Sequence, residues 1–225
     1  MTQGSGYYAR PRPEMVAFVP AQARRILDVG CGQGCFAARL KAERSVEVWG
    51  IELDPLAAGM AAQRLDRILQ GDAVALAPAL PDEHFDCIVL NDLLEHLVSP
   101  ETLLGLLRAK LGPGGCLVAS LPNVRHFPHL WELVVRGRWE YADEGILDRT
   151  HLRFFTRRSM RRLFEAAGYD LVRQEGINPT RSWKYRLANV LACGRLGDAR
   201  WLQYACLAVL RPAAAASPTP PAGRP

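Results

Sequence analysis

Short apolar runs alternate with amphipathic stretches along most of the chain, beginning at Arg25. The runs at residues 25–29 and 46–51 predict buried strands, and further strands are predicted at 68–70, 85–90, 116–121, 169–174 and 201–210. Between them, apolar residues recur at helical spacing, as in Ala58, Ala61, Ala62 and Leu65. Strands that alternate with helices pair in parallel through right-handed crossovers. The pattern therefore predicts an α/β fold around a mostly parallel sheet.

Turn and capping residues place the helix boundaries. Residues 30–34 form a turn that leads into a helix ending near Glu43, and Asp54 with Pro55 supplies an N-cap and a proline at the first helical position. Ser99, Pro100 and Glu101 open another helix, which the glycines and proline of 112–115 are expected to end. Thr156 is expected to cap a last helix, which ends at Gly168 and shares one apolar face among Met160, Leu163, Phe164 and Ala167.

Three segments interrupt this alternation, and they define the domain organisation. Residues 1–20 are a proline-bearing lead-in, and residues 122–155 are too long for a plain crossover and are expected to cover a site. Residues 212–225 form an alanine- and proline-rich tail that we expect to be disordered. The expectation is one domain over residues 1–211, with a cofactor half at about 21–121 and an acceptor cover at about 122–155.

Composition and charge narrow the class of protein. Of 225 residues, 49% are hydrophobic and 23% charged, and no apolar run is long enough to predict a membrane span. The N-terminus lacks the layout of a signal peptide, which predicts a cytoplasmic protein. The net charge of +5 and six arginines within 149–162 would suit an acidic partner. No aromatic RNA-binding signature accompanies them, so a solvated helix face is preferred and a nucleic-acid partner is not expected. The oligomeric state is left open.

The six cysteines predict neither disulfides nor a metal site. None forms a CxxC pair, and no histidine follows at the spacing of a zinc site. We expect reduced, buried thiols and no bound metal.

The glycine-rich turn after the first strand carries the strongest chemical signal. Gly30, Gly32 and Gly34 alternate in a GxGxG pattern, with Asp28 two residues earlier. The dinucleotide fingerprint is GxGxxG, and its helix N-terminus receives a pyrophosphate. A carboxylate beside the turn tolerates an ammonium better than a phosphate, so this spacing favours a cofactor that is cationic at that point.

Two further acids follow the next two strands. Glu52 ends the second strand about twenty residues after the glycine turn, the position from which an acid hydrogen-bonds ribose hydroxyls. Asp72, after Gly71, offers an acceptor for an adenine amino group. The alternative interpretation of each residue is an acid in a solvent-facing loop with no role in binding.

The ordered motifs ILDVGCGQG, GIELDP, GD, FDCIVLNDLLEHL and LGPGGCLVASLPN resemble the class I S-adenosylmethionine-dependent methyltransferase family over residues 25–123. The resemblance implies a Rossmann-like seven-stranded sheet of order 3-2-1-4-5-7-6, with the last strand antiparallel and helices on both faces. It implies S-adenosylmethionine as cofactor and S-adenosylhomocysteine as product. Asp28 and Gly30 would serve the methionine end, Glu52 the ribose, Asp72 with Ala73 the adenine, and Asn91 the neighbourhood of the sulfonium. The cofactor-binding set is completed by Cys31, Gly32, Gly34 and Leu53.

The acceptor half carries weaker signals. Residues 145–156 look like a segment of bacterial methyltransferases linked to surface-polysaccharide or lipid-pathway chemistry, and they are similar to a shorter stretch of ubiquinone-biosynthesis O-methyltransferases. His151 is the candidate general base and Asp148 a second candidate, ahead of His96, His126 and His129. Glu95 and His96 of LLEHL are common in ubiquinone-type relatives, or else pack a helix start. The aromatic residues expected to wall an acceptor pocket, or only to pack the cover, are Phe127, Trp131, Trp139 and Tyr141.

The expected function is methyl transfer to a small-molecule, glycan or lipid-pathway acceptor, at oxygen. The alternatives are a methyltransferase acting on RNA or protein, a non-catalytic methyltransferase-like subunit and a nicotinamide dehydrogenase. The intact glycine turn and Glu52 disfavour the subunit, and the glycine spacing disfavours the dehydrogenase.

Overall fold

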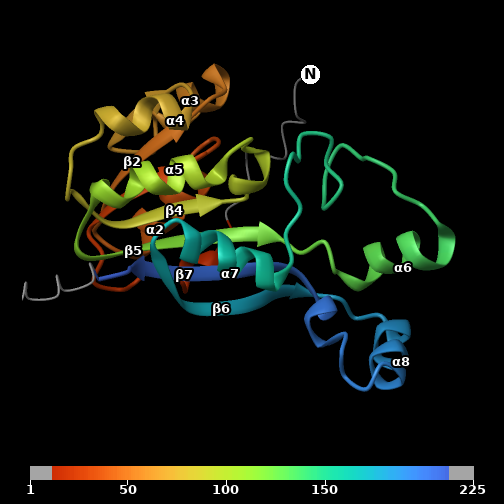
Figure 1. Ribbon diagram of the computed structural model, residues 1–225. Helices are drawn as coiled ribbons and strands as arrows, with labels where there is room; N and C mark the ends of the chain where they lie inside the picture. Colours follow the sequence, from red (N-terminus) through yellow and green to blue (C-terminus); the bar gives the residue numbers. More distant parts are fainter. Residues whose placement is uncertain (1–11, 213–225) are drawn as a thin grey trace, which may run out of the picture.

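A seven-stranded sheet forms the centre of the computed structural model, which describes residues 12–212 (Figure 1). Its strand order is β3-β2-β1-β4-β5-β7-β6, as expected. All neighbouring strands pair in parallel except β7, which runs antiparallel to both β5 and β6. The expected α/β architecture is confirmed.

The strands lie close to the predicted runs. They are β1 (Arg25–Val29), β2 (Glu47–Glu52), β3 (Arg67–Gln70), β4 (Phe85–Asn91), β5 (Leu111–Pro122), β6 (Tyr169–Pro179) and β7 (Trp201–Leu210). The α-helices are α1 (Pro13–Val16), α2 (Cys35–Glu43), α3 (Pro55–Ala61), α4 (Ala73–Leu76), α5 (Pro100–Leu107), α6 (Phe127–Arg136), α7 (Arg157–Ala166) and α8 (Trp183–Leu191). Short 3₁₀ turns include η2 (Leu94–His96) and η4 (Gly197–Arg200).

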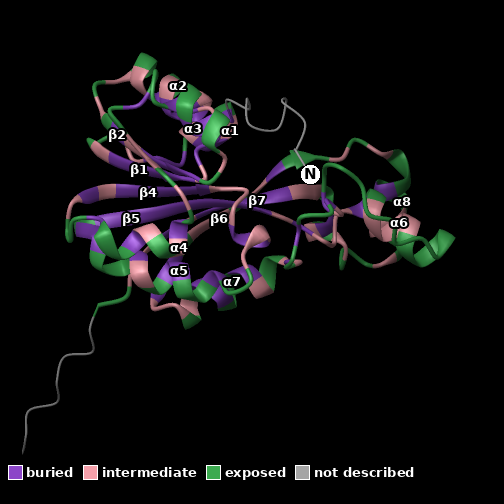
Figure 2. Cartoon of the chain, turned by 90° about the horizontal axis from the view of Figure 1, so that it is seen from above, coloured by how far each residue is buried: buried purple, intermediate pink, exposed green. Residues whose placement is uncertain are grey.

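Helices cover both faces of the sheet, and each face has its own apolar core (Figure 2). On one face α1, α2 and α3 bury Met15, Phe36 and Leu40. On the other, α4, α5 and α7 bury Leu103, Leu107, Phe164 and their neighbours. Burial of both faces explains why the central strands read as continuous apolar runs rather than as alternating ones.

Most of the predicted helix boundaries hold. The Asp54 carboxylate accepts from the backbone N–H of Ala57 at 2.8 Å and caps α3. Thr156 caps α7 and forms a capping box with Ser159, while Gly168 follows the helix with a positive φ of 84°.

Two details near α5 were predicted wrongly. The side chain of Ser99 makes no capping hydrogen bond, because its hydroxyl lies 2.9 Å from that of Thr102 instead. The α-helix ends at Leu107 and a 3₁₀ turn follows, so the glycines and proline of 112–115 belong to the start of β5. Pairing between β4 and β5 shifts register there, which accommodates the extra residues.

The segment 122–155 divides into two parts. Its first part forms α6, which packs beyond the sheet against α8 through Phe127, Tyr185 and Ala199 (Figure 1). Its second part, from Ile146 to Arg153, lies against η2, where the amides of Leu152 and Arg153 both donate to the carbonyl of Glu95. The helix α8 was not predicted.

The remaining expectations concern the chain as a whole. Among residues 12–212, no helix has the length and apolarity that crossing a bilayer requires. All six cysteines are unpaired, and four of them are buried. The expected disordered tail falls, apart from Pro212, on residues outside the described part of the chain.

Candidate functional site

A cavity of about 640 Å³ opens at the carboxyl ends of β1, β2 and β4, where ligands of open α/β sheets bind. The parallel register aligns Asp28 with Gly50 and with Val89, which brings these strand ends together. The predicted cofactor-binding residues that line this first cavity are Asp28, Gly30, Cys31, Gly32, Glu52, Leu53, Asp72, Ala73 and Asn91.

The glycine turn brings its backbone up against the first cavity. Gly30 and Gly32 have positive φ values of 72° and 54°, which residues other than glycine rarely adopt. A Cβ on Gly30 would lie 3.1 Å from Cδ1 of Leu93. Gly34 is not among the residues that line the cavity. It precedes α2 with a φ of 74°, and a Cβ there would lie 2.4 Å from Cδ1 of Leu65, so its observed role is helix packing.

The side chain of Glu52, at the end of β2, holds the glycine turn by a hydrogen bond. Its side chain is buried, Oε2 accepts from the amide of Gly32 at 2.7 Å, and Oε1 accepts from the amide of Asp54 at 2.9 Å. These bonds hold the carboxylate at the edge of the first cavity in a fixed orientation. The sequence indicated an acid at this position but not its bond to the turn.

Asp28 is a buried acid in the wall of the first cavity. It is 2% exposed, and Oδ2 of its carboxylate has no hydrogen-bond partner among the residues that the structure describes. Burial, and then the charge of Glu52, raises the pKa of Asp28 from its ordinary 3.8 to about 7. A cationic ligand group would satisfy this oxygen and stabilise its ionised form.

Asn91, at the end of β4, has both side-chain amide atoms buried, and neither has a hydrogen-bond partner in the described part of the chain. Asp72 accepts from the amide of Ala75 at 2.9 Å through Oδ1, caps α4 and lines the first cavity. The donors and acceptors around the first cavity therefore suit a ligand with a cationic end near Asp28 and polar groups near Glu52 and Asp72. These residues fit S-adenosylmethionine, whose ammonium and ribose hydroxyls match them in kind.

A smaller second cavity of about 170 Å³ adjoins the first and shares Arg12 and Asp92 with it. Among residues 12–212, its lining includes the guanidinium of Arg12 and the carboxyl groups of Glu14, Asp92, Glu95, Glu144 and Asp148. His151 lines it as well. The second cavity lies under residues 145–151 of the cover, at the place where the sequence predicted an acceptor site.

Asp92 forms the wall between the two cavities, and sequence reasoning missed it. Its backbone has a positive φ of 50°, a strained conformation for aspartate. Its carboxylate pairs with Arg12 and accepts from the hydroxyl of Ser120 at 2.8 Å and the amide of Gln203 at 2.9 Å. Because these partners lie up to 111 residues away, no local pattern indicated the contact.

His151 and His96 meet at this wall, with ring centroids 4.7 Å apart. The Nδ1 of His151 donates to the carbonyl of Ile146 at 2.9 Å, so its Nε2 carries the lone pair. The Nδ1 of His96 lies 3.0 Å from the hydroxyl of Thr150, and burial, then the nearby His151, lowers the pKa of His96. The side chain of the candidate Asp148 contacts Thr150, whose hydroxyl donates to the carboxylate at 2.6 Å, while the backbone carbonyl of Asp148 accepts from the amide of His151 at 3.0 Å.

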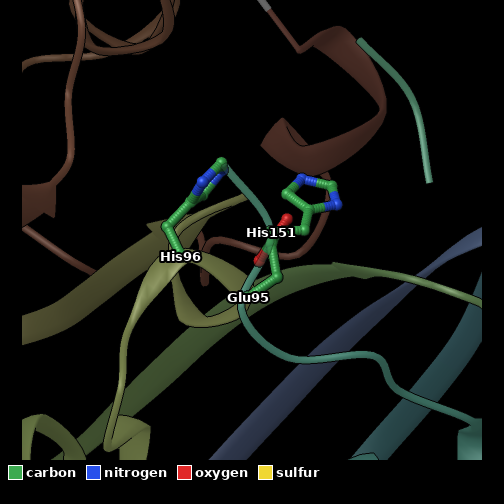
Figure 3. Close-up of side chains that lie close together, drawn as sticks. All are labelled: Glu95, His96 and His151. Carbon is green, nitrogen blue, oxygen red and sulfur yellow. The ribbon is translucent and has the colours of Figure 1, made fainter. Parts of the chain in front are cut away.

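Glu95 lies beneath both imidazoles and is 1% exposed, and within residues 12–212 neither of its carboxylate oxygens has a hydrogen-bond partner (Figure 3). Burial, and then the charge of Asp92, raises the pKa of Glu95 well above its usual range. The sequence singled out Glu95 and His96 as a pair, and the structure brings His151 to them from 55 residues away.

The other sequence candidates lie elsewhere. His126 precedes the first residue of α6 and His129 lies within this helix, and neither lines the first or the second cavity. Burial, and then the nearby His129, lowers the pKa of His126 to about 4. Phe127 and Trp131 pack within the contact between α6 and α8, and Trp139 packs against His129 and Phe154. The aromatic set therefore packs the cover and does not wall either cavity, and Tyr141 is exposed.

Comparison with known proteins agrees with this geometry. The family described as methyltransferase domain matches residues 3–174. An uncharacterized methyltransferase of Mycobacterium tuberculosis is 33% identical over 143 residues, which are 56% of this chain and 70% of the relative. A ubiquinone biosynthesis O-methyltransferase of Cereibacter sphaeroides is 28% identical over 183 residues, covering 78% of this chain and 72% of the relative.

Among solved structures, a SAM-dependent methyltransferase from Archaeoglobus fulgidus superposes with a TM-score of 0.63 at 21% identity, over 90% of this chain and 92% of that one. This likeness shows the shared fold. The family match covers most of the chain and includes the glycine turn, Glu52 and Asp72. The chain therefore belongs to the methyltransferase-domain family and is a class I S-adenosylmethionine-dependent methyltransferase.

Proposed function

We propose that this methyltransferase transfers the methyl group to a hydroxyl oxygen of a neutral small-molecule, glycan or lipid-pathway acceptor in the cytoplasm. The observation that carries the proposal is the second cavity, which adjoins the first and has His151 in its wall. Unpaired cysteines are compatible with a reducing compartment.

Different residues of the chain bind the cofactor in the first cavity and the acceptor in the second. The cofactor supplies a methyl group on a sulfonium, a good leaving group. Asp28 holds the cofactor's ammonium, and Glu52 orients its ribose while keeping the glycine turn in place. Asn91 faces the reacting end with two buried polar atoms. Catalysis then depends mainly on holding the acceptor oxygen in line with the methyl group.

His151 is placed to act on the acceptor hydroxyl. The carbonyl of Ile146 fixes its tautomer, which leaves the Nε2 lone pair to draw on the hydroxyl proton. Asp148 serves as a positioning residue, because it holds Thr150 and, through Thr150, the ring of His96.

The charge and size of the second cavity restrict the acceptor. Among the described residues, the acidic groups of the lining outnumber its one arginine, which disfavours a phosphate-rich chain such as RNA. The volume of about 170 Å³ is below the roughly 300–1,000 Å³ of drug-sized ligand pockets, so it admits only the reacting end of a larger acceptor. A phenol or sugar ring with a hydroxyl satisfies both limits, and the ubiquinone-biosynthesis relative is a named O-methyltransferase.

The test is methyl labelling. The enzyme is incubated with methyl-labelled S-adenosylmethionine and separate fractions of neutral lipids and phenols, glycans, RNA and protein. We expect label in a neutral, hydroxyl-bearing fraction, and expect His151→Ala to lower turnover about 10²–10⁴-fold with unchanged cofactor affinity. His129→Ala, on α6, is the matched control and should retain turnover. Label confined to RNA or protein would contradict the proposal.

A further inference from the structure

Glu95, His96 and His151 bring three potential ligand atoms together. One carboxylate oxygen and one ring nitrogen of each histidine all lie within 4.8 Å of one another. Figure 3 shows the carboxylate of Glu95 reaching up between the two imidazole rings. Tetrahedral coordination at about 2.0–2.2 Å places ligand atoms about 3.3–3.6 Å apart, so small side-chain rotations would close this cluster around one ion.

Glu95 points to a cation independently of that spacing. A carboxylate that is 1% exposed and accepts no hydrogen bond is costly to leave unsatisfied. The guanidinium of Arg12, whose charge acts on Glu95, is already paired with Asp92 and Glu14. The acidic second cavity that Glu95 lines adds further negative charge around the same point.

The histidines are held as metal-binding histidines usually are. A ligating imidazole typically uses its second nitrogen to donate to a carbonyl or another oxygen, which fixes the ring. Nδ1 of His151 donates to the carbonyl of Ile146, and Nδ1 of His96 lies against the hydroxyl and carbonyl oxygens of Thr150. Thr150 is itself fixed by Asp148.

We propose that Glu95, His96 and His151 bind one divalent transition-metal ion, Mn²⁺ or Zn²⁺ by ligand type, at the wall between the two cavities. Three protein ligands leave coordination positions open, as in catalytic rather than structural sites. The ion then receives the acceptor hydroxyl from the second cavity and faces the methyl group in the first. This role rests on the proposed O-methyl transfer, whereas ion binding itself does not.

The reaction balances without any oxidant. The bound hydroxyl, made more acidic by the cation, releases its proton to water. An oxygen lone pair forms the bond to the methyl carbon, and sulfur keeps the electron pair of the bond that breaks. When the ion is bound, the Nε2 lone pair of His151 coordinates the ion and therefore does not accept the hydroxyl proton directly. His151 then promotes loss of that proton by holding the ion against the acceptor oxygen.

The cluster also explains why cysteine and histidine spacing predicted no metal. Only Glu95 and His96 are adjacent, and His151 arrives from the cover segment through the fold.

Binding of the ion is tested without an acceptor. Enzyme stripped with a chelator is titrated with Mn²⁺ and Zn²⁺ by calorimetry, and bound Mn²⁺ is followed by electron paramagnetic resonance. We expect one ion per chain, and an affinity at least tenfold lower in Glu95→Gln, His96→Gln and His151→Gln. His129→Gln, outside both cavities, is the matched control and should bind normally. Far-UV circular dichroism and thermal melting, expected to match wild type, establish that each variant is folded.

Half-buried His96 keeps the test decisive if the buried Glu95 variant fails to fold. No stoichiometric binding, or binding that survives the histidine substitutions, would overturn the proposal. Activity that is indifferent to chelation would overturn the catalytic role and leave O-methyl transfer standing. Stoichiometric binding together with label only in RNA or protein would instead overturn the proposed acceptor and leave the ion site standing.

Discussion

Glu52 connects two functions in one carboxylate, since it holds the glycine turn and faces the first cavity. We expect Glu52→Gln to lower affinity for S-adenosylhomocysteine about ten- to a hundredfold, because a hydrogen bond to a charged acceptor contributes about 1.5–3 kcal/mol. Calorimetry measures the loss and thermal melting verifies the fold. Glu47→Gln, at the opposite end of β2, is the control. Unchanged affinity in a folded Glu52 variant would remove this residue from the ribose role.

Asp28 should make cofactor binding depend on pH. With a pKa of about 7, the carboxylate loses its charge as pH falls below 7, so affinity for S-adenosylhomocysteine should fall by up to about tenfold per pH unit. Asp28→Asn should bind weakly with no such slope. A wild-type affinity constant from pH 8 to pH 5.5 would contradict this account.

The same shift affects stability. Because the folded protein holds the Asp28 proton more firmly than the unfolded chain does, stability should decline as pH rises from about 4 to 7. The Asp28→Asn variant should lack this decline, and urea denaturation at pH 5 and pH 8 measures the difference.

At the scale of elements, substitutions at two glycines distinguish the effect of helix propensity on stability from the effect of backbone strain. Gly105 lies inside α5 and an added Cβ would meet nothing within 4 Å, whereas Gly114, equally open, has a φ of 73°. We expect Gly105→Ala to stabilise the protein by about 0.5–1 kcal/mol. Gly114→Ala should destabilise it, because alanine is strained at that φ. Urea denaturation distinguishes them, and equal effects would refute the distinction.

The elements also show what the sequence could reveal. Strands buried on both faces, helix stripes, Asp54 and Thr156 are local signals, and they predicted all seven strands and the starts of α3 and α7, but neither α4 nor the start of β5 at Leu111. The helix α8 was missed although Trp183, Leu187, Val190 and Leu191 recur at helical spacing. In the structure this apolar stripe is exposed, and only Tyr185 of the nine residues is buried.

The second cavity could not be predicted from local signals either. It depends on Arg12 meeting Asp92 across 80 residues, and on His151 meeting Glu95. The sequence supplied His151 and Asp148 as candidates, but it did not indicate the bond between the Asp148 carboxylate and the Thr150 hydroxyl.

At the scale of the whole molecule, the sheet should unfold as one unit. Gly176 in β6 lies under Trp201 of β7, and an added Cβ would come 2.0 Å from the indole Cγ. We expect Gly176→Ala to cost about 1–3 kcal/mol, and to lower Tm by about 2–4 °C per kcal/mol without dividing the transition. Fluorescence and far-UV circular dichroism should give coincident melting curves. Two separate transitions would show that the β6–β7 edge unfolds independently.

The position of β7 has a consequence for how the protein is made. This last strand of the described chain lies inside the sheet, between β5 and β6, and β6 contacts the sheet only through it. Until β7 leaves the ribosome, a nascent chain exposes the unpaired edge of β5, which can pair with another chain. About 90 residues separate the ends of β5 and β7, so at roughly 5–20 residues per second this interval lasts ~5–20 s. Translation that stops within it would release a fragment with its cofactor strands complete and an open, apolar β5 edge.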